Sequence, residues 1–203
     1  MFAEHSQPMR YALVLLLVVA CGPKSYDYPY GKEPDPRNKE LILGVGDVVG
    51  VNVWENQGVN TEATIRPDGT ITMPLVGDVK AAGRTPSELR EAIKSQLQNF
   101  LKLAAGNEVT VAVRSWKSYR FTLDGEVSKA GVFTSDHYVT VDDAIAMAGG
   151  LTRFAKRSDI ILFRTDPKSG QIRQVLFDYD LLASGKRIDM NIYVLPGDRI
   201  YVP

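Results

Sequence analysis

The 203-residue sequence contains a single cysteine and only two histidines, His5 and His137. One cysteine cannot form an intramolecular disulfide, and these three residues cannot supply the ligand cluster of a structural zinc site. The 24 Lys and Arg residues balance the 24 Asp and Glu residues, so no excess of positive charge indicates nucleic acid as a partner. These scarcities exclude disulfide-stapled and zinc-finger proteins as classes, and we predict no nucleic-acid partner.

Long apolar runs are scarce as well. Residues 11–20 are apolar, but a helix that crosses a bilayer needs about 20 such residues. The length is typical of the hydrophobic region of a signal peptide, and the run ends at Val18-Val19-Ala20-Cys21, which is typical of a lipobox. A thiol takes diacylglycerol in such proteins, so we predict a lipoprotein signal peptide over residues 1–20 and lipidation of Cys21. An ordinary secretory signal or an interfacial anchor is the alternative, and both Met1 and Met9 fit as the start.

Residues 21–40 are rich in proline and charge and show no apolar period, so we predict a tether there. Tyr26, Tyr28 and Tyr30 alternate within it. The alternation fits local strand addition or stacking on carbohydrate. It also fits a lipoprotein linker in which the tyrosines have no special role.

The first folded unit is predicted over residues 41–115 and combines short strands with one helix. Alternating valines indicate strands over residues 49–53 and 109–113. A Gly46-Asp47 turn precedes the first of these strands. Asp68-Gly69 is a hairpin signal between strands over residues 64–66 and 70–72.

The helix of this unit is predicted to begin at Thr85, whose hydroxyl caps the first turn while Glu88 closes the capping box. Gly106-Asn107 is expected to end the element. Apolar residues at four-residue steps form one face that packs on a sheet: Leu89, Ile93, Leu97 and Leu101.

The second unit, residues 116–203, contains two predicted glycine turns, at Gly125 and Gly131, and a short helix. Thr140 is the predicted N-cap, with Asp143 at the capping-box position, and Gly149-Gly150 supplies the left-handed C-cap. So short a helix is not stable alone and must lie against a sheet. Its apolar stripe consists of Val141, Ala144, Ile145 and Ala148.

Further strands are predicted over residues 160–163 and 174–178, with a turn at residues 166–170 between them and a short helix over residues 178–182. A last strand over residues 199–202 follows a Gly197-Asp198 turn. The surroundings of this turn resemble those of Gly46-Asp47. We interpret the likeness as convergent turn chemistry, because glycine allows positive φ and aspartate bonds the backbone.

Residues with catalytic chemistry are few. Ser135 and Asp136 adjoin His137, but adjacency in sequence does not by itself produce triad geometry. Two carboxylate pairs, Asp124/Glu126 and Asp178/Asp180, are what a sugar hydrolase requires, yet such pairs occur in every soluble protein. We therefore predict no enzyme activity, no cofactor and no metal. Aspartates beside glycines are assigned to turns: Asp47, Asp68, Asp78 and Asp198.

Basic residues concentrate in the second unit. They fit a passage for an acidic polysaccharide, and they also fit an ordinary solvated surface. The residues are Lys117, Arg120, Lys129, Arg153, Lys156 and Arg157.

Both units carry motifs that resemble known domains. Residues 65–79, IRPDGTITMPLVGDV, with AGRT at residues 82–85, resemble the polysaccharide biosynthesis/export domain. Residues 125–155 contain G-E-V-x-x-x-G-V-F and T-V-x-D-A-I-A-x-A-G-G-L-T-x-x-A, which resemble the SLBB module, a β-grasp-like fold. In this order behind a lipoprotein signal, residues 41–203 resemble the outer-membrane polysaccharide export proteins of the Wza type. The resemblance implies an α+β fold, with an export domain of short strands and one helix before a β-grasp-like SLBB domain.

The same resemblance implies a homo-oligomeric ring that conducts capsule or exopolysaccharide, lipid-anchored at the periplasmic face of the outer membrane. It implies an inner-membrane co-polymerase, or its tyrosine kinase, as a partner. Wza-type proteins continue into an amphipathic helix that forms the pore, whereas this sequence stops at residues 201–203 after a strand. We therefore expect a separate outer-membrane pore protein. A soluble sugar-binding lipoprotein module and a polysaccharide-cleaving enzyme are the alternatives.

Overall fold

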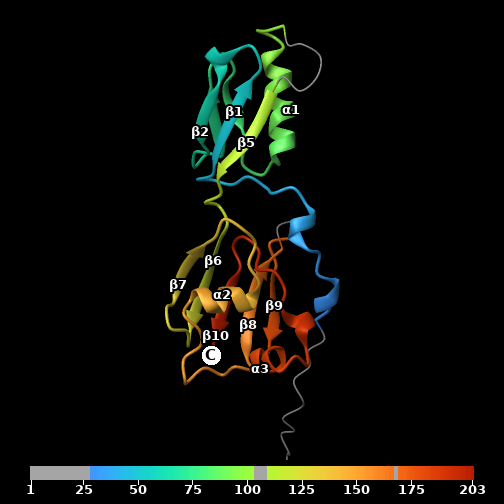
Figure 1. Cartoon of the computed structure of the whole chain (residues 1–203), viewed down its shortest axis with the longest axis vertical. Coiled ribbons are helices and arrows are strands. Elements are labelled where there is room, and N and C mark those ends of the chain that lie inside the picture. The colour runs from blue at the N-terminus through green and yellow to red at the C-terminus, as the bar shows by residue number, and fades with distance from the viewer. Residues whose placement is uncertain (1–27, 103–108, 167–168) are drawn as a thin grey trace, which may run out of the picture.

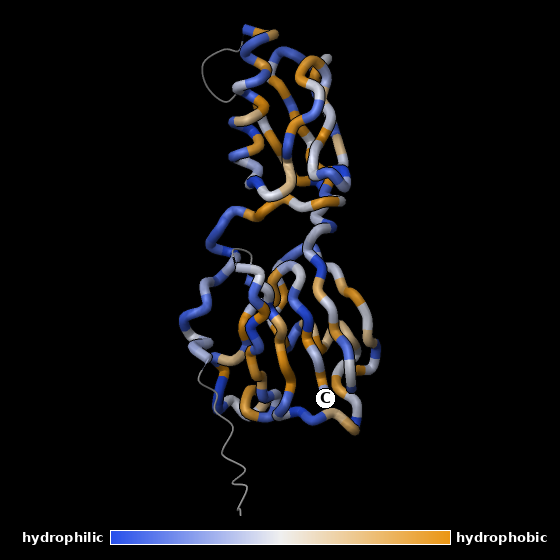
Figure 2. The backbone as a smooth tube through the Cα atoms, turned by 180° about the vertical axis from the view of Figure 1, so that it is seen from behind, coloured by the Kyte–Doolittle hydropathy of each residue, from blue (hydrophilic) through white to orange (hydrophobic). Residues whose placement is uncertain are grey.

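The computed structural model describes residues 28–102, 109–166 and 169–203. They form two lobes that follow one another along the long axis of the molecule (Figure 1). Each lobe has its own buried hydrophobic core. Hydrophobic and hydrophilic positions alternate along many of the strands (Figure 2), as expected of sheets with one covered face.

The first lobe is built on a three-stranded antiparallel sheet. β1 (Val48–Val53) is its central strand, between β2 (Thr61–Thr64) and β5 (Val109–Ser115). The alternating valines of β1 are at most 2% exposed, and α1 (Pro86–Leu97) is buried through Leu89, Ile93 and Leu97 in the same core. The helix ends at Leu97, so Leu101 packs against the core from beyond it, and Gly106-Asn107 lies outside the described residues.

The hairpin predicted across Asp68-Gly69 is wrong. The turn forms, with Gly69 at φ +79°, but β2 pairs with β1, whereas β3 (Thr70–Met73) pairs with β4 (Gly77–Lys80) in a separate two-stranded sheet. Tertiary pairing decides this: the N–H of Ile65 donates to the carbonyl of Asp47 (2.8 Å), which directs the chain before the turn toward β1.

The second lobe is a five-stranded sheet in the order β7-β6-β10-β8-β9. Its strands are β6 (Arg120–Gly125), β7 (Gly131–Thr134), β8 (Ile160–Thr165), β9 (Ile172–Phe177) and β10 (Arg199–Val202). The last strand in sequence therefore lies in the middle, parallel to β6 and antiparallel to β8. Two short helices, α2 (Val141–Met147) and α3 (Tyr179–Ala183), accompany the sheet.

Part of the predicted tether is folded. η1 (Tyr30–Lys32) and η2 (Pro36–Asn38) are short 3-10 helices, and Tyr30 is 3% exposed in the core of the second lobe. The Tyr30 hydroxyl donates to the carbonyl of Leu176, and burial raises the pKa of Tyr30 to about 12. Residues 28–40 are therefore not a free linker; Cys21 and Tyr26 lie outside the described residues.

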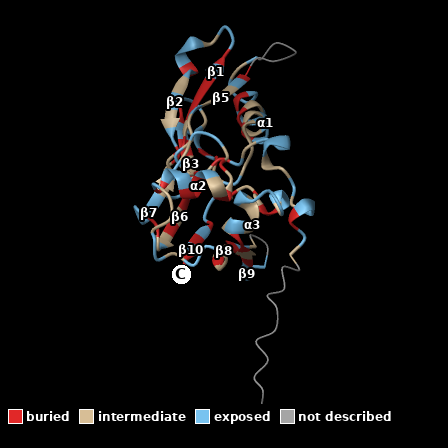
Figure 3. Cartoon of the chain, turned by 60° about the horizontal axis from the view of Figure 1, so that its bottom comes forward, coloured by how far each residue is buried: buried red, intermediate tan, exposed pale blue. Residues whose placement is uncertain are grey.

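The predicted α+β class is confirmed, since both lobes combine sheets with helices. Buried residues lie within the sheets and on the inner sides of α1 and α2, and exposed ones cover the turns and the outer sides of the helices (Figure 3). Two further 3-10 helices, η3 (Gln57–Val59) after β1 and η4 (Ile188–Met190) before β10, complete the described elements.

Candidate functional site

The chain passes between the lobes twice, once over residues 39–44 and once over residues 115–119 (Figure 1). Asp47, which is fully buried, joins the two crossings. Its Oδ1 accepts from the N–H of Ser118 (2.7 Å), and its Oδ2 accepts from the Ser118 hydroxyl (2.8 Å) and from the N–H of Gly44 (2.8 Å). A Cβ at Gly44 would lie 2.3 Å from the Cβ of Ser118, so the crossings pack too closely for any other residue.

Asp198 forms a second buried junction. It is 2% exposed, and the guanidinium of Arg164 donates to it from Nη2 (2.7 Å). Arg164 also pairs through Nη1 with Glu33 (3.0 Å), so it fastens the segment before the first crossing to the second lobe. Burial raises the pKa of the Asp198 carboxyl, while the hydrogen bonds from Arg164 and from the N–H of Leu195 act against this shift.

The two Gly-Asp turns have the same local geometry. Gly46 and Gly197 have φ of +92° and +87°. In each turn the aspartate Oδ2 accepts from the N–H three residues before it, at 2.8 Å for Asp47 and 2.7 Å for Asp198. Both turns therefore have the predicted local chemistry, a glycine at positive φ and an aspartate that accepts from the backbone. The long-range partners, Ser118 and Arg164, leave no local sequence signal, so sequence reasoning missed them.

A cavity of about 580 Å³ lies beside the second junction and is lined by both crossings, by the segment before the first crossing and by the second lobe. Its walls are mostly apolar, with Ile42, Tyr138 and Leu195 among them. Trp116 also lines it and stacks on Tyr119 at 4.7 Å between ring centroids, and the Trp116 Nε1 is buried without a partner among the described residues.

The residues considered for catalysis do not form a catalytic relay. Nδ1 of His137 contacts both Asp136 (2.6 Å) and Ser135 (3.3 Å), so a single ring nitrogen meets both groups and no relay through the ring is formed. The carboxylates of the first pair have structural partners. Asp124 forms an ion pair with Arg199, and Glu126 accepts a hydrogen bond from the Thr152 hydroxyl (2.5 Å).

The second carboxylate pair is also structural. Asp178 caps α3 by accepting from the N–H of Leu181, and Asp180 pairs with Arg157 (2.6 Å). Arg157 also lies over the ring of Tyr179, as Arg153 does over Phe154. Within the described residues, no group of three or more His, Cys, Asp or Glu side chains is placed to hold a metal.

The predicted caps form capping boxes: Thr85 with Glu88 at α1, and Thr140 with Asp143 at α2. Gly149 and Gly150 follow α2 with φ of +80° and +86°.

Gly125 has φ +87°, and a Cβ there would lie 1.9 Å from the carbonyl oxygen of Val202. Gly131 is different from the turn glycines: it opens β7 without a positive φ and faces open space, so the turn role predicted for it is wrong. The turn lies before it, and β7 already needs an extended residue at this position.

Residues 35–130 match the family described as "Polysaccharide biosynthesis/export protein", and residues 120–176 match the SLBB domain. The chain belongs to the Wza-type polysaccharide export family. Members of this family are export components rather than known enzymes. Within the described residues, no helix is long and apolar enough to cross a bilayer.

Similar proteins carry names of polysaccharide production or export. The exopolysaccharide production protein ExoF of Rhizobium meliloti is 32% identical over 127 residues, which cover 58% of this chain and 30% of ExoF. The capsule polysaccharide export outer membrane protein CtrA of Neisseria meningitidis serogroup B is 26% identical over 183 residues, 77% of this chain and 42% of CtrA. The EPS I polysaccharide export outer membrane protein EpsA of Ralstonia solanacearum is 28% identical over 133 residues, 54% of this chain and 34% of EpsA. The chain thus spans less than half the length of these relatives.

Proposed function

We propose that this protein is a periplasmic, lipid-anchored and ring-forming component of a capsule or exopolysaccharide export channel. The observation that carries the proposal is the succession of an export-family match and an SLBB match across two lobes with separate cores. Residues 41–115 serve as the export domain and residues 116–203 as the SLBB domain. Transport of this kind requires a shaped, wettable surface and no reacting group, which agrees with the structural roles of the carboxylates.

The ring needs two different surfaces on each subunit, because a head-to-tail interface closes only when unlike faces meet. The second lobe offers two such surfaces, the opposite edges of its sheet, at β7 and β9. Val132 on β7 is 66% exposed, and Ile172 on β9 is 65% exposed. Each edge strand thus presents an apolar side chain, and on β9 this residue lies at the end of the strand away from Leu176, whose carbonyl accepts from Tyr30. Edge strands of this kind are used in strand addition.

Deletion of the gene tests the export role. Surface polysaccharide should be lost, while repeat-unit synthesis continues inside the cell. Normal surface polysaccharide in a clean deletion without a paralogue contradicts export and favours a sugar-binding module.

Crosslinking in intact cells tests the proposed partners, which are an inner-membrane co-polymerase or its tyrosine kinase and a separate outer-membrane pore protein. If crosslinking captures none of these proteins, the proposed partners are contradicted.

The lipid anchor is tested by Cys21→Ser. A hydroxyl cannot replace the thiol, so the variant should stay unprocessed or leave the membrane fraction, and it should lose incorporation of labelled fatty acid. Unchanged fractionation and unchanged label contradict lipidation at Cys21.

A further inference from the structure

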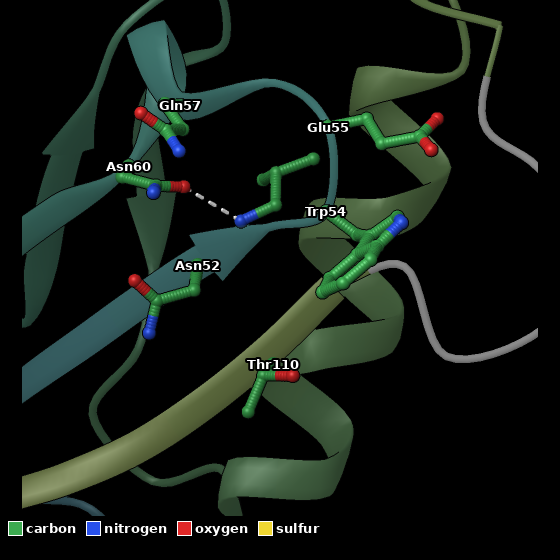
Figure 4. A pocket seen from close by; sticks show the side chains of 7 residues that line it. Asn52, Trp54, Glu55, Gln57, Asn60 and Thr110 are labelled. Atoms are coloured by element: carbon green, nitrogen blue, oxygen red, sulfur yellow. Dashed lines mark hydrogen bonds between the residues drawn. The ribbon is translucent and has the colours of Figure 1, made fainter.

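The first lobe carries an exposed tryptophan at the end of β1. Trp54 is 72% exposed, and it lies beside a cavity of about 360 Å³ that is open to solvent. The cavity is also lined by Asn52, Gln57, Asn60 and Thr110 (Figure 4). A single apolar residue on the surface needs no ligand to explain it. A large aromatic side chain beside polar side chains that line an open cavity is a more specific indication of a ligand site.

The backbone around Trp54 is fixed. The N–H of Val53 donates to Oδ1 of Asn60 (2.7 Å), and Nδ2 of Asn56 donates to the carbonyl of Trp54 (3.1 Å). The following turn passes through Glu55, a non-glycine residue with φ +59°, and Val59 anchors its far end in the core at 6% exposure. The aromatic face is thus presented by a braced turn, which lowers the entropy cost of binding.

Most polar side chains of the cavity have no hydrogen-bond partner within the described residues. The side chains of Asn52, Gln57 and Thr110 make no hydrogen bond to another described residue, and the Asn60 amide uses its oxygen alone. Asn52 and Thr110 are directly opposite each other in the β1–β5 register, so they share the uncovered face of the sheet. Amides both donate and accept, as do the hydroxyl groups of a sugar.

Charge defines the kind of sugar. The described lining contains no Lys or Arg, and its one carboxylate, on Glu55, points away from the amides in Figure 4. An anionic sugar would lose hydration here without gaining a cationic partner. The volume is at the small end of small-molecule pockets and takes about one or two rings of a longer chain.

We propose that Trp54, with the amides of Asn52, Gln57 and Asn60, forms a subsite for a neutral pyranose segment of a polysaccharide. The Trp54 face packs on the apolar face of a sugar ring, and the amides bind its hydroxyl groups. This inference rests on the proposed export function and assigns the transported chain a contact in the first lobe.

Tryptophan fluorescence tests the subsite, because the protein contains only two tryptophans. In Trp116→Phe, which keeps an aromatic ring on Tyr119, Trp54 is the single reporter. Cellohexaose and chitohexaose are the neutral probes, and hexagalacturonate is the anionic one. Saturable changes in emission are expected with a neutral probe, at an affinity at least several-fold above that for hexagalacturonate.

Variants of Trp54 and of Phe154 test whether binding depends on stacking at Trp54 or on any exposed aromatic residue. Calorimetry with the better neutral probe should show about a tenfold loss of affinity in Trp54→Ala and a smaller loss in Trp54→Phe. Phe154→Ala, which removes another exposed aromatic (67% exposed), should bind as the original protein does. No saturable binding of either neutral probe, preference for hexagalacturonate, or equal affinity of Trp54→Ala overturns the proposal.

Complementation distinguishes this subsite from the export function itself. In a deletion strain that has lost surface polysaccharide, Trp54→Ala should restore less polymer than the original gene at equal protein level. If deletion has no effect, the proposed function fails. If deletion blocks export and Trp54→Ala restores it fully, only the subsite fails.

Discussion

At the scale of single residues, Asp47 holds the two crossings together through three hydrogen bonds, two of them from backbone N–H groups. In Asp47→Ala, the N–H groups of Ser118 and Gly44 lose their acceptor, so we expect a loss of about 1–3 kcal/mol or more in the free energy of unfolding. Urea unfolding measures it. Ser118→Ala is the matched control, since it removes the hydroxyl bond alone and should cost less. Equal losses in both variants contradict a central role for the carboxylate.

Asp68 makes the stability of the first lobe depend on pH in the acid range. Hydrogen bonds from the hydroxyl and the N–H of Thr70, and then from Arg66, lower the pKa of Asp68 to about 2. A carboxyl with a lowered pKa in the folded state stabilises above its ordinary pKa and ceases to do so as pH falls from about 4 to about 2. Melting temperatures should therefore fall over this range, and Asp68→Asn should fall less steeply. An identical pH profile for the variant contradicts this assignment.

At the scale of elements, the end of α2 depends on two glycines with positive φ. A β-branched residue fits this conformation poorly, so Gly150→Val should destabilise the second lobe by about 1 kcal/mol or more. Gly149→Val should be at least as severe, because its Cβ would also lie 3.1 Å from that of Ser128. Gly131→Val is the control: its site is extended and open, and its melting temperature should be nearly unchanged. Equal melting temperatures for all three variants contradict this account of the helix end.

At the scale of the whole molecule, the proposed ring rests on contact between the two sheet edges of neighbouring subunits. Val132→Lys alone and Ile172→Glu alone should each reduce the ring population in native mass spectrometry, because each places a charge in an apolar contact. The double variant should recover part of it if the β7 edge of one subunit meets the β9 edge of the next. Ile188→Glu, at a residue 70% exposed but on η4, should assemble normally. Rings unaffected by either edge variant place the interface elsewhere.

The sequence by itself determined the local elements, because their causes are local. The capping boxes of α1 and α2, the alternating valines of β1 and the Gly-Asp turns follow from neighbours within a few residues. The order of the export-domain and SLBB motifs was sufficient to predict the family. Tertiary structure decided what depends on distant partners: the pairing of β2 and β3 with different strands, the central place of β10 and the docking of Tyr30. It also decided that Asp47 and Asp198 meet Ser118 and Arg164, since a buried carboxylate takes its donors from whichever segments the packed lobes bring within reach.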